Sequence, residues 1–513
     1  MDRKDKIKEY KRSIQPMGVY QIRNKVNGKI FIGRSKDLKG ILNRIKFQLK
    51  NNLHVNKNMQ NDFNEMGEAN FSFEILDYLE PKEDMEENYK KELRKLTMNQ
   101  FNSITRRNFL KLAFLSSVMP ASGFCTASRD HTAKLIEKIE SSIIWPGRIK
   151  GKTWFHPRAC RIPASGDPVI LMTCQSITGS DVFGQVYWSR SADNGKSWTQ
   201  PQPIISLGRR QLSENIEEGV CDVVPDFHSR SNSVLAIGHN VYYKDNVLTQ
   251  PYENRYPMYV VGDANGNWSD RKKLEWDNPE RSGIYTCGCA QRITFDNGNI
   301  LLPLSFGPKE RKDRKVCTVL CSFNGNELNI IKSGNVLELK VKRGLLEPSL
   351  ALIKNRFFMT IRAEDGFGYV SVSDDGLLWE KKQRWCWDDG EPLTMSTTQQ
   401  RWISHSQGLF LVYTRKSANN INVMRWRAPL YIAEVDTDKL FLIRESEQLV
   451  FPLIGDGIYD PDHVARMGNF HTVNASRRET WVTVGETLPL EDWKGNTLLG
   501  RIYWNQNNEL VHF

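Results

Sequence analysis

Residues 191–198 read SADNGKSW, and a looser copy, VSDDGLLW, occupies residues 372–379. In this S-x-D-x-G-x-x-W pattern the Asp carboxylate accepts backbone N–H groups inside a tight turn. The Gly permits a positive φ that a side chain would resist. The Trp offers a large apolar surface that can fill the space between neighbouring sheets. Two copies with the same D-x-G-x-x-W spacing predict a recurring turn rather than two unrelated hairpins.

Weaker copies of the pattern follow along the chain: DANGNW at 263–268, SFNGNEL at 322–328 and AEVDTDKLFL at 433–442. Their anchors at positions 193, 263, 324, 374 and 436 lie between 50 and 70 residues apart. This spacing is close to the length of one four-stranded blade, which indicates a radial repeat of small sheets. The chain after residue 130 is rich in Trp, Tyr and Gly and poor in helical periodicity, so we expect it to be mostly β.

The turn pattern resembles the Asp box of sialidases and related BNR-repeat proteins. The resemblance implies a six-bladed β-propeller over residues 129–513. Because the Asp box is a structural element that lies far from the substrate, it suggests a fold and not an activity. The predicted fold class is therefore mainly β, with the propeller preceded by a small α/β domain.

The positive charge of the chain is concentrated at its front. Residues 1–130 carry 25 Lys and Arg against 16 Asp and Glu, a net charge of +9 out of +11 for the whole chain. This balance is compatible with a polyanionic partner such as DNA for the front segment only. No stretch approaches the roughly 18 apolar residues that a membrane span requires, so no membrane span is expected.

Residues 98–128 resemble a twin-arginine export signal. Arg106 and Arg107 are followed by Phe-Leu-Lys, a short apolar run and small residues. The resemblance implies recognition by the twin-arginine export machinery and a periplasmic or secreted protein. About a hundred residues precede this signal, and Met98 stands at its start, so a merged gene is one interpretation. If residues 1–97 are present and block export, we expect a cytoplasmic protein. A basic amphipathic helix is the alternative reading of the segment.

Residues 1–97 contain two short strand-like runs around Asn27-Gly28, which predict a β-hairpin. Gly18-Val19-Tyr20 and Phe31-Ile32-Gly33 resemble the two motifs of the GIY-YIG nuclease domain. The resemblance implies Tyr20 as a catalytic residue and Glu87 as the ligand of a Mg²⁺ ion. Phe31 lacks the hydroxyl of the second motif, and an ungapped reading places Ile41 and Ile45 where the family has Arg and His. We therefore predict the fold, with impaired nuclease chemistry.

Several residues after position 129 match the sialidase site in chain order. Sialidases hold the carboxylate of their sugar with three arginines, because planar guanidinium groups bind a carboxylate in bidentate geometry. They protonate the leaving group with an Asp and activate a Tyr nucleophile with a Glu. The matching positions are Arg161 in the RIP motif, Asp181 as the acid, Glu347 as the activating residue, Arg362 as the second arginine, and Arg425 or Arg427 as the third.

The nucleophile is the gap in this resemblance. The region aligned with the catalytic Tyr reads ARMGNFH, and Tyr459 lies about ten residues too early. Further polar and aromatic residues fall in stretches that a propeller brings to its central face. They are His228, His239, Gln399, Gln400 and Arg401, with Asp222, Tyr242 and Trp402 as additional pocket candidates. Taken singly, each histidine also fits a structural role.

The nine cysteines show no spacing typical of a metal site, and no cofactor is predicted for the propeller. We predict a sialidase-like glycoside hydrolase that acts on an acidic glycan or oligosaccharide. Two alternatives stay open: a non-catalytic glycan-binding propeller, and a DNA endonuclease that acts through the front domain.

Overall fold

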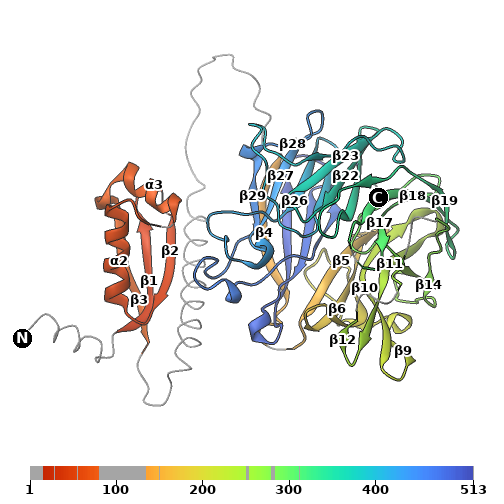
Figure 1. Cartoon of the computed structure of the whole chain (residues 1–513), viewed down its shortest axis with the longest axis horizontal. Coiled ribbons are helices and arrows are strands. Elements are labelled where there is room, and N and C mark those ends of the chain that lie inside the picture. Colours follow the sequence, from red (N-terminus) through yellow and green to blue (C-terminus); the bar gives the residue numbers. More distant parts are fainter. Residues whose placement is uncertain are drawn as a thin grey trace, which may run out of the picture. The chain divides into compact units, whose positions relative to one another are not determined.

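The computed structural model describes residues 16–27, 29–54, 56–79, 135–149, 151–249, 254–278, 283–310 and 312–511. The chain divides into two compact units, residues 1–130 and 131–513 (Figure 1). Glu87 and the twin-arginine-like segment at 98–128 lie outside the described residues. None of the described helices is long and apolar enough to cross a membrane.

The front unit is a small α/β domain, as predicted. Its antiparallel sheet has the strand order β2-β1-β3, and two helices follow the hairpin. The Asp37 carboxylate caps the first helix by accepting the N–H of Gly40 at 2.8 Å. The elements are β1 (Met17–Asn24), β2 (Ile30–Ser35), α2 (Leu38–Lys50), α3 (Lys57–Met66), η1 (Glu68–Asn70) and β3 (Phe71–Leu79).

The core of the front domain explains two sequence departures. Ile45 is buried, and Ile41 packs on the same apolar cluster, which also contains Tyr20. Side chains that replace a polar Arg and His therefore contribute here to the hydrophobic core of the domain. Lys39 and Arg44, which could replace the family's Arg only after a shift of the sequence register, are exposed on the same helix α2.

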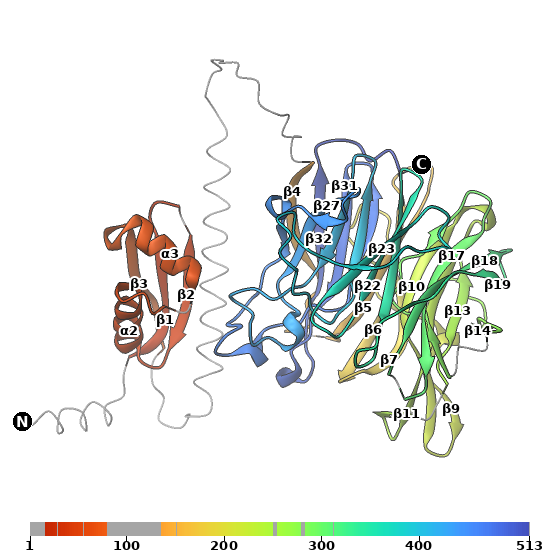
Figure 2. The same ribbon diagram turned by 45° about the horizontal axis from the view of Figure 1, so that its top comes forward.

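The back unit is mainly β, and its described strands form six antiparallel sheets, the blades of a propeller (Figures 1 and 2). Blades one and two contain β5 (Trp154–Ile162), β6 (Val169–Gly179), β7 (Val182–Ser191) and β8 (Gln202–Pro203), then β9 (Arg210–Ser213), β10 (Ile216–His228), β11 (Ser233–Lys244), β12 (Val247–Leu248), β13 (Pro257–Gly262) and β14 (Lys272–Lys273). Blades three and four contain β15 (Gly283–Thr286), β16 (Ile293–Thr294), β17 (Ile300–Pro308), β18 (Lys315–Phe323), β19 (Leu328–Ser333) and β20 (Leu337–Glu338), then β21 (Leu346–Ile353), β22 (Arg356–Arg362), β23 (Gly368–Ser373) and β24 (Gln383–Arg384).

The last two blades close the ring. Blade five contains β25 (Arg401–His405), β26 (Gly408–Tyr413), β27 (Leu430–Asp436), β28 (Phe441–Leu442) and β29 (Gln448–Phe451), and blade six contains β30 (Phe470–Ser476), β31 (Glu479–Gly485), β32 (Thr497–Trp504) and β4 (Ile136–Trp145). Strand β4, from the start of the unit, pairs with β32 from its end (Figure 2). The ladder between them joins both ends of the propeller chain, so neither end leaves an open blade.

The repeated turns form as expected and dock each blade onto the one before it. Asp193 accepts the N–H of Ser197 at 3.0 Å, and Gly195 has a φ of 73°. In blade two, Trp268 packs against Trp188 of blade one, with ring centroids 6.4 Å apart. In blade four, Trp379 donates its indole N–H to the Thr318 hydroxyl of blade three at 2.9 Å. The Trp residues therefore connect neighbouring sheets.

The second turn corrects one predicted anchor. Asp375, not Asp374, accepts the backbone N–H groups of Leu377 and Leu378, at 2.8 and 2.7 Å. Ser373 donates its hydroxyl to Asp375 at 3.0 Å, as Ser191 does to Asp193. The Ser-x-Asp spacing is thus preserved, and the Gly follows the Asp directly. The shared D-x-G-x-x-W spacing pointed to the wrong aspartate because this turn is one residue shorter.

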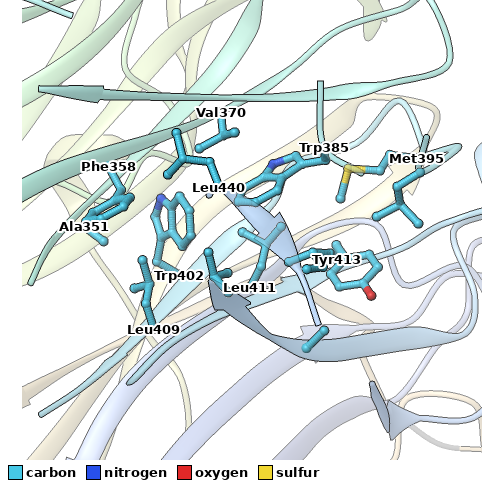
Figure 3. Packing of buried hydrophobic residues seen from close by; sticks show 14 of the residues in the cluster. Ala351, Phe358, Val370, Trp385, Met395, Trp402, Leu409, Leu411, Tyr413 and Leu440 are labelled. Atoms are coloured by element: carbon cyan, nitrogen blue, oxygen red, sulfur yellow. The ribbon is translucent and has the colours of Figure 1, made fainter. Parts of the chain in front are cut away.

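Large aromatic side chains fill the space between blades four and five. Figure 3 shows Trp385 and Trp402 between Phe358 and Val370 on one side and Leu411 on the other. The two indole rings meet edge to face, with centroids 5.7 Å apart. Because Trp402 is 1% exposed and donates its N–H to the Ser349 carbonyl at 2.9 Å, it stabilises the core and does not stack on a sugar.

Candidate functional site

The site lies where the first long strands of neighbouring blades meet. Strand β5 contacts β10 and β30, and β21 contacts β25. Three of these strands carry a β-bulge with a left-handed residue, namely His156 at φ 52°, Asp222 at φ 57° and Glu347 at φ 46°. Non-glycine residues rarely adopt this conformation, and such strain concentrates at functional sites. At the bulges, the side chains of His156, Asp222 and Glu347 therefore depart from the regular alternation of strand side chains between the two faces of the sheet.

Glu347 and Arg362 form the most direct contact in the site. Arg362 Nη1 lies 2.5 Å from Glu347 Oε1, and the Arg362 side chain is 6% exposed. Burial favours a raised pKa for the Glu347 carboxyl, but the charge and hydrogen bond of Arg362 outweigh it and lower that pKa. Glu347 is therefore a carboxylate at neutral pH.

Two further arginines crowd the same region. Arg425 lies in η5 (Met424–Trp426), and Arg427 follows it directly. Burial, together with the positive charges of Arg362 and Arg425, lowers the pKa of Arg427 to about 9. The Nε atoms of Arg362 and Arg427 are buried and have no hydrogen-bond partner among the described residues. Three clustered guanidinium groups with unused donors form a suitable site for an anion.

Asp222 is held by a buried polar network. It pairs with the fully buried Arg158 and lies 3.4 Å from His156 Nε2. Burial favours a raised pKa for Asp222, but the charges of His156 and Arg158 outweigh it and lower that pKa. Gln399 joins Arg158 to Arg401 by accepting hydrogen bonds at 3.4 and 2.8 Å. The network fixes the Asp222 carboxylate in its ionised form.

Asp181 lies at the exposed tip of the hairpin between β6 and β7, with a φ of 58°. Its charge acts on both Arg427 and His156. The Tyr243 hydroxyl donates to the Asp181 carbonyl at 3.1 Å and accepts the Phe183 N–H at 3.0 Å. Arg209 stacks on the Tyr243 ring at 3.8 Å and donates two bonds to the Phe183 carbonyl. These contacts hold the backbone of the hairpin in place, while the Asp181 carboxylate stays accessible to solvent.

His239 lies on β11 directly opposite Cys221 of β10. Its Nε2 is 3.4 Å from the Cys221 sulfur, and it is 8% exposed. Burial lowers the pKa of His239 to about 3 despite the nearby charge of Asp222. His239 is therefore neutral at physiological pH. We define the central cluster as Asp181, Asp222, His239, Glu347, Arg362, Arg425 and Arg427.

The structure does not bring four other candidates to the central cluster. Arg161 lines a separate cavity of about 510 Å³ together with Asp226, Arg292 and His471. His228 is buried where it caps η3 (Ser229–Ser231) and contacts the Gly298 carbonyl at 2.9 Å. Gln400 accepts a hydrogen bond from Thr360 between blades four and five. Tyr459 is 68% exposed, and its contact among the described residues is with Asp456.

Two of these placements, those of Arg161 and Gln400, have simple physical reasons. The bulge at His156 and Pro157 turns His156 toward Asp222, so Arg161, five residues further along β5, lies at a different cavity. Gln399 and Gln400 are consecutive residues that make separate contacts, and only Gln399 meets the arginines. Tyr242 is also a buried structural residue, whose hydroxyl accepts the Asn240 side-chain N–H at 2.9 Å.

Of the two buried arginines that Gln399 joins, Arg401 was among the polar candidates from the sequence, and Arg158 was missed. Arg158 and Arg401 are both fully buried and face each other through Gln399. His156 was also missed. An Arg inside an otherwise apolar strand, as in WFHPRAC, was a signal for a buried charge, but the bulge that orients His156 leaves no mark in the periodicity.

The front unit matches a known family. Residues 16–102 match the family model of the GIY-YIG catalytic domain. Tyr20, from the first motif, is 4% exposed, and the ring of Phe31 lies 6.3 Å from it. Gly33 is required beside Tyr20, since a Cβ at this position would lie 2.4 Å from the Tyr20 hydroxyl oxygen. The front unit is therefore a GIY-YIG domain, as the motifs predicted.

The back unit has the fold of sialidases. The chain is similar to a Trypanosoma rangeli sialidase in complex with the inhibitor DANA (14% identity, TM-score 0.51, 72% of this chain and 60% of that one) and to a Hadza microbial sialidase (12% identity, TM-score 0.50, 71% and 68%). It is also similar to a Dyadobacter fermentans protein of unknown function (12% identity, TM-score 0.50, 73% and 100%). No match was found among curated proteins. The chain spans about 60% of the length of the trypanosomal enzyme, and at these identities the likeness shows the fold alone.

Proposed function

We propose that the propeller binds and hydrolyses a glycan that carries a carboxylate, such as a sialoside or a uronide. The observation that carries this proposal is the convergence of Arg362, Arg425 and Arg427 beside the Glu347 carboxylate. A substrate carboxylate would supply acceptors for the unused buried donors of Arg362 and Arg427. Planar guanidinium groups suit this task better than ammonium groups do.

The proposed chemistry uses two carboxylates in different environments. Asp181 is exposed on a hairpin tip, where it can meet water and donate a proton to the leaving oxygen. Glu347 is held ionised by Arg362 and would orient or activate the attacking group. Tyr459, the tyrosine nearest in sequence to the expected nucleophile, is exposed in the segment between β29 and η7 (Pro461–His463). We therefore propose that the attacking group is not the tyrosine that sialidases use.

A panel of fluorogenic glycosides tests this function on the full chain. The panel contains an α-sialoside, several uronides and neutral hexosides as negative controls. We expect turnover of at least one acidic member and loss of that turnover in Glu347→Gln. Glu338→Gln is the matched control, because Glu338 pairs with Lys315 only at 3.9 Å and is largely exposed. Turnover that is confined to neutral sugars would contradict the proposal.

A non-catalytic glycan-binding propeller is the second candidate, and the exposed position of Tyr459 favours it. In that case the acidic glycans of the panel would bind to the chain without turnover. Arg362→Lys would then weaken glycan binding. The effect of Glu347→Gln on turnover could not be observed, because the unmodified protein would show no turnover. Equilibrium binding measured on the same panel distinguishes the two functions.

The GIY-YIG domain supports a third candidate, a DNA endonuclease. Tyr20 is retained and buried, and Glu87 would hold a Mg²⁺ ion, but Phe31, Ile41 and Ile45 replace polar groups. Plasmid nicking by the full chain with Mg²⁺, lost in Tyr20→Phe, would support this activity. Intact plasmid at high protein concentration would leave the domain with a binding role only.

We also propose export of the propeller through the twin-arginine machinery. The basis is the RRNFLK sequence at residues 106–111 and the small residues that follow it. Since the receptor reads the paired arginines and not the charge alone, changing Arg106 and Arg107 to Lys is expected to retain the protein in the cytoplasm. Fractionation of cells that express the two forms decides the question.

A further inference from the structure

We propose that Cys221, Asp222 and His239 form a three-ligand site for a divalent transition-metal ion, with Zn²⁺ as the expected metal. The site lies within the central cluster but does not depend on the glycan function. It adds a metal to a propeller for which the sequence predicted no cofactor.

The β-bulge in β10 creates the site. Cys221 is paired with His239 and Val224 with Ile237, so Asp222 and Val223 together oppose Gly238. A bulge of this kind leaves two residues facing one and re-aims their side chains. In this way the consecutive Cys221 and Asp222 come to face the same His239, which a regular strand would prevent. The ligand set is thus assembled across one hairpin.

The distances fit a zinc site. Cys221 Sγ lies 3.4 Å from His239 Nε2 and 4.0 Å from Asp222 Oδ2. The ligand atoms of the three residues all lie within 4.8 Å of one another. In a tetrahedral zinc site with ordinary bond lengths, neighbouring ligand atoms are about 3.4–3.6 Å apart.

Each ligand has an unused lone pair available. The Asp222 Oδ1 atom is held by Arg158 and lies near His156, whereas Oδ2 faces the Cys221 sulfur. His239 is 92% buried, and its Nδ1 has no hydrogen-bond partner among the described residues. The contact of its other nitrogen is the Cys221 sulfur. Metal binding would therefore use the lone pair of Nε2, the nitrogen that faces Cys221, while Nδ1 keeps its hydrogen atom.

Loss of the thiol proton limits the charge that the metal adds to this site to one unit. On binding, the Cys221 thiol loses its proton to water and forms a sulfur–metal bond. The thiolate and the Asp222 carboxylate then neutralise the divalent cation, so the charge of the site changes from −1 to zero beside Arg158 and Arg255. Arg158 and His156 bind the outer carboxylate oxygen and orient Asp222, as outer partners do in metal sites.

Three protein ligands leave one tetrahedral position open. Sites of this type bind water or a substrate oxygen there, whereas structural zinc sites use four protein ligands. Glu347 lies close enough to His239 for its charge to act on that ring.

Co²⁺ substitution tests the site on the full chain without any assumption about activity. A thiolate–Co²⁺ bond gives an intense near-ultraviolet charge-transfer band. We expect one equivalent of Co²⁺ to produce this band, excess Zn²⁺ to abolish it, and Cys221→Ser to lack it. Cys174→Ser is the matched control, since Cys174 is fully buried in β6 but belongs to blade one.

His239→Gln keeps the thiol and tests the imidazole separately. We expect its Zn²⁺ affinity to fall at least tenfold, the smallest effect typical of a lost contribution to a metal site. Circular dichroism and thermal unfolding confirm that each variant is folded. The proposal is overturned if the unchanged chain gives no band, or if a folded Cys221→Ser variant keeps it. Neither result bears on turnover of acidic glycosides.

Discussion

Arg362 and Glu347 stand at the end of one strand and the start of its neighbour, and their side chains meet at 2.5 Å beside a bulge in β21. The bulge places Glu347 and Pro348 opposite Ile361, so the carboxylate turns toward the guanidinium instead of the blade interior. This pair orients both a cation for substrate binding and a carboxylate for chemistry. Its geometry leads directly to the first prediction.

Arg362→Lys is expected to weaken binding of acidic glycans by about one to two powers of ten. Lysine keeps the charge but loses the planar fork, and a lost charge-assisted hydrogen bond costs about 1.5–3 kcal/mol. Arg356→Lys is the matched control, because Arg356 lies at the other end of β22 and donates to the Thr437 carbonyl. Equal affinities for the two variants would remove Arg362 from the binding site.

The second prediction separates two adjacent aspartates. Asp375→Ala should destabilise the propeller by about 1–3 kcal/mol, because two backbone N–H groups and the Ser373 hydroxyl lose their acceptor. Asp374→Ala should stay within about 0.5 kcal/mol, as surface substitutions usually do. Urea unfolding of both variants measures the difference. The reverse order of stabilities would show that Asp374 is the anchor after all.

The repeated turns and the chain order of the site made the fold predictable from the sequence. The spacing of the turns indicated a propeller, and Glu347, Arg362, Arg425 and Arg427 do lie together. The bulges were not predictable, because they depend on the pairing partner and leave the local composition unchanged. For this reason His156 was missed, and the resemblance to the RIP motif pointed to Arg161, which lies at a different cavity. The turn at Asp375 is one residue shorter than the turn at Asp193. The sequence did not reveal this difference, because Asp374 and Asp375 are adjacent and either could be the anchor.

The third prediction concerns acid stability. Burial, with the charges of Arg401 and Arg158, holds the pKa of His471 well below its ordinary value of 6.5. The unfolded chain therefore binds a proton more readily than the folded chain, so the stabilisation is complete above pH 6.5 and is lost as the pH falls toward the folded pKa. One such proton changes the free energy of unfolding by at most about 1.4 kcal/mol per pH unit.

His471→Gln should reduce the loss of stability between pH 6.5 and 5, because the variant has no imidazole to protonate. Urea unfolding at pH 7.5, 6.5, 5.5 and 5 provides the measurement. His463→Gln is the control, since that ring is 29% exposed near Asp460. If the two variants show the same pH slope as the unchanged chain, protonation of His471 does not contribute to acid unfolding.

The last prediction concerns the residue that permits the β10 bulge. A Cβ on Gly238 would lie 2.4 Å from the Cys221 carbonyl oxygen and 2.7 Å from a methyl group of Val223. The first of these atoms belongs to the backbone, so relief requires a shift of the bulge and of Asp222 with it. Overpacking of this kind costs about 1–3 kcal/mol, and backbone strain adds to it.

Gly238→Ala should therefore lower both the free energy of unfolding and the intensity of the thiolate–Co²⁺ band. Gly166→Ala is the matched control, because a Cβ on Gly166 would meet no atom within 4 Å. The control should change stability by less than about 0.5 kcal/mol and leave the band intact. A stable Gly238→Ala variant with an unchanged band would mean that the bulge does not set the position of Asp222 and Cys221. A destabilised variant that still binds Co²⁺ normally would assign Gly238 to the fold and not to the site.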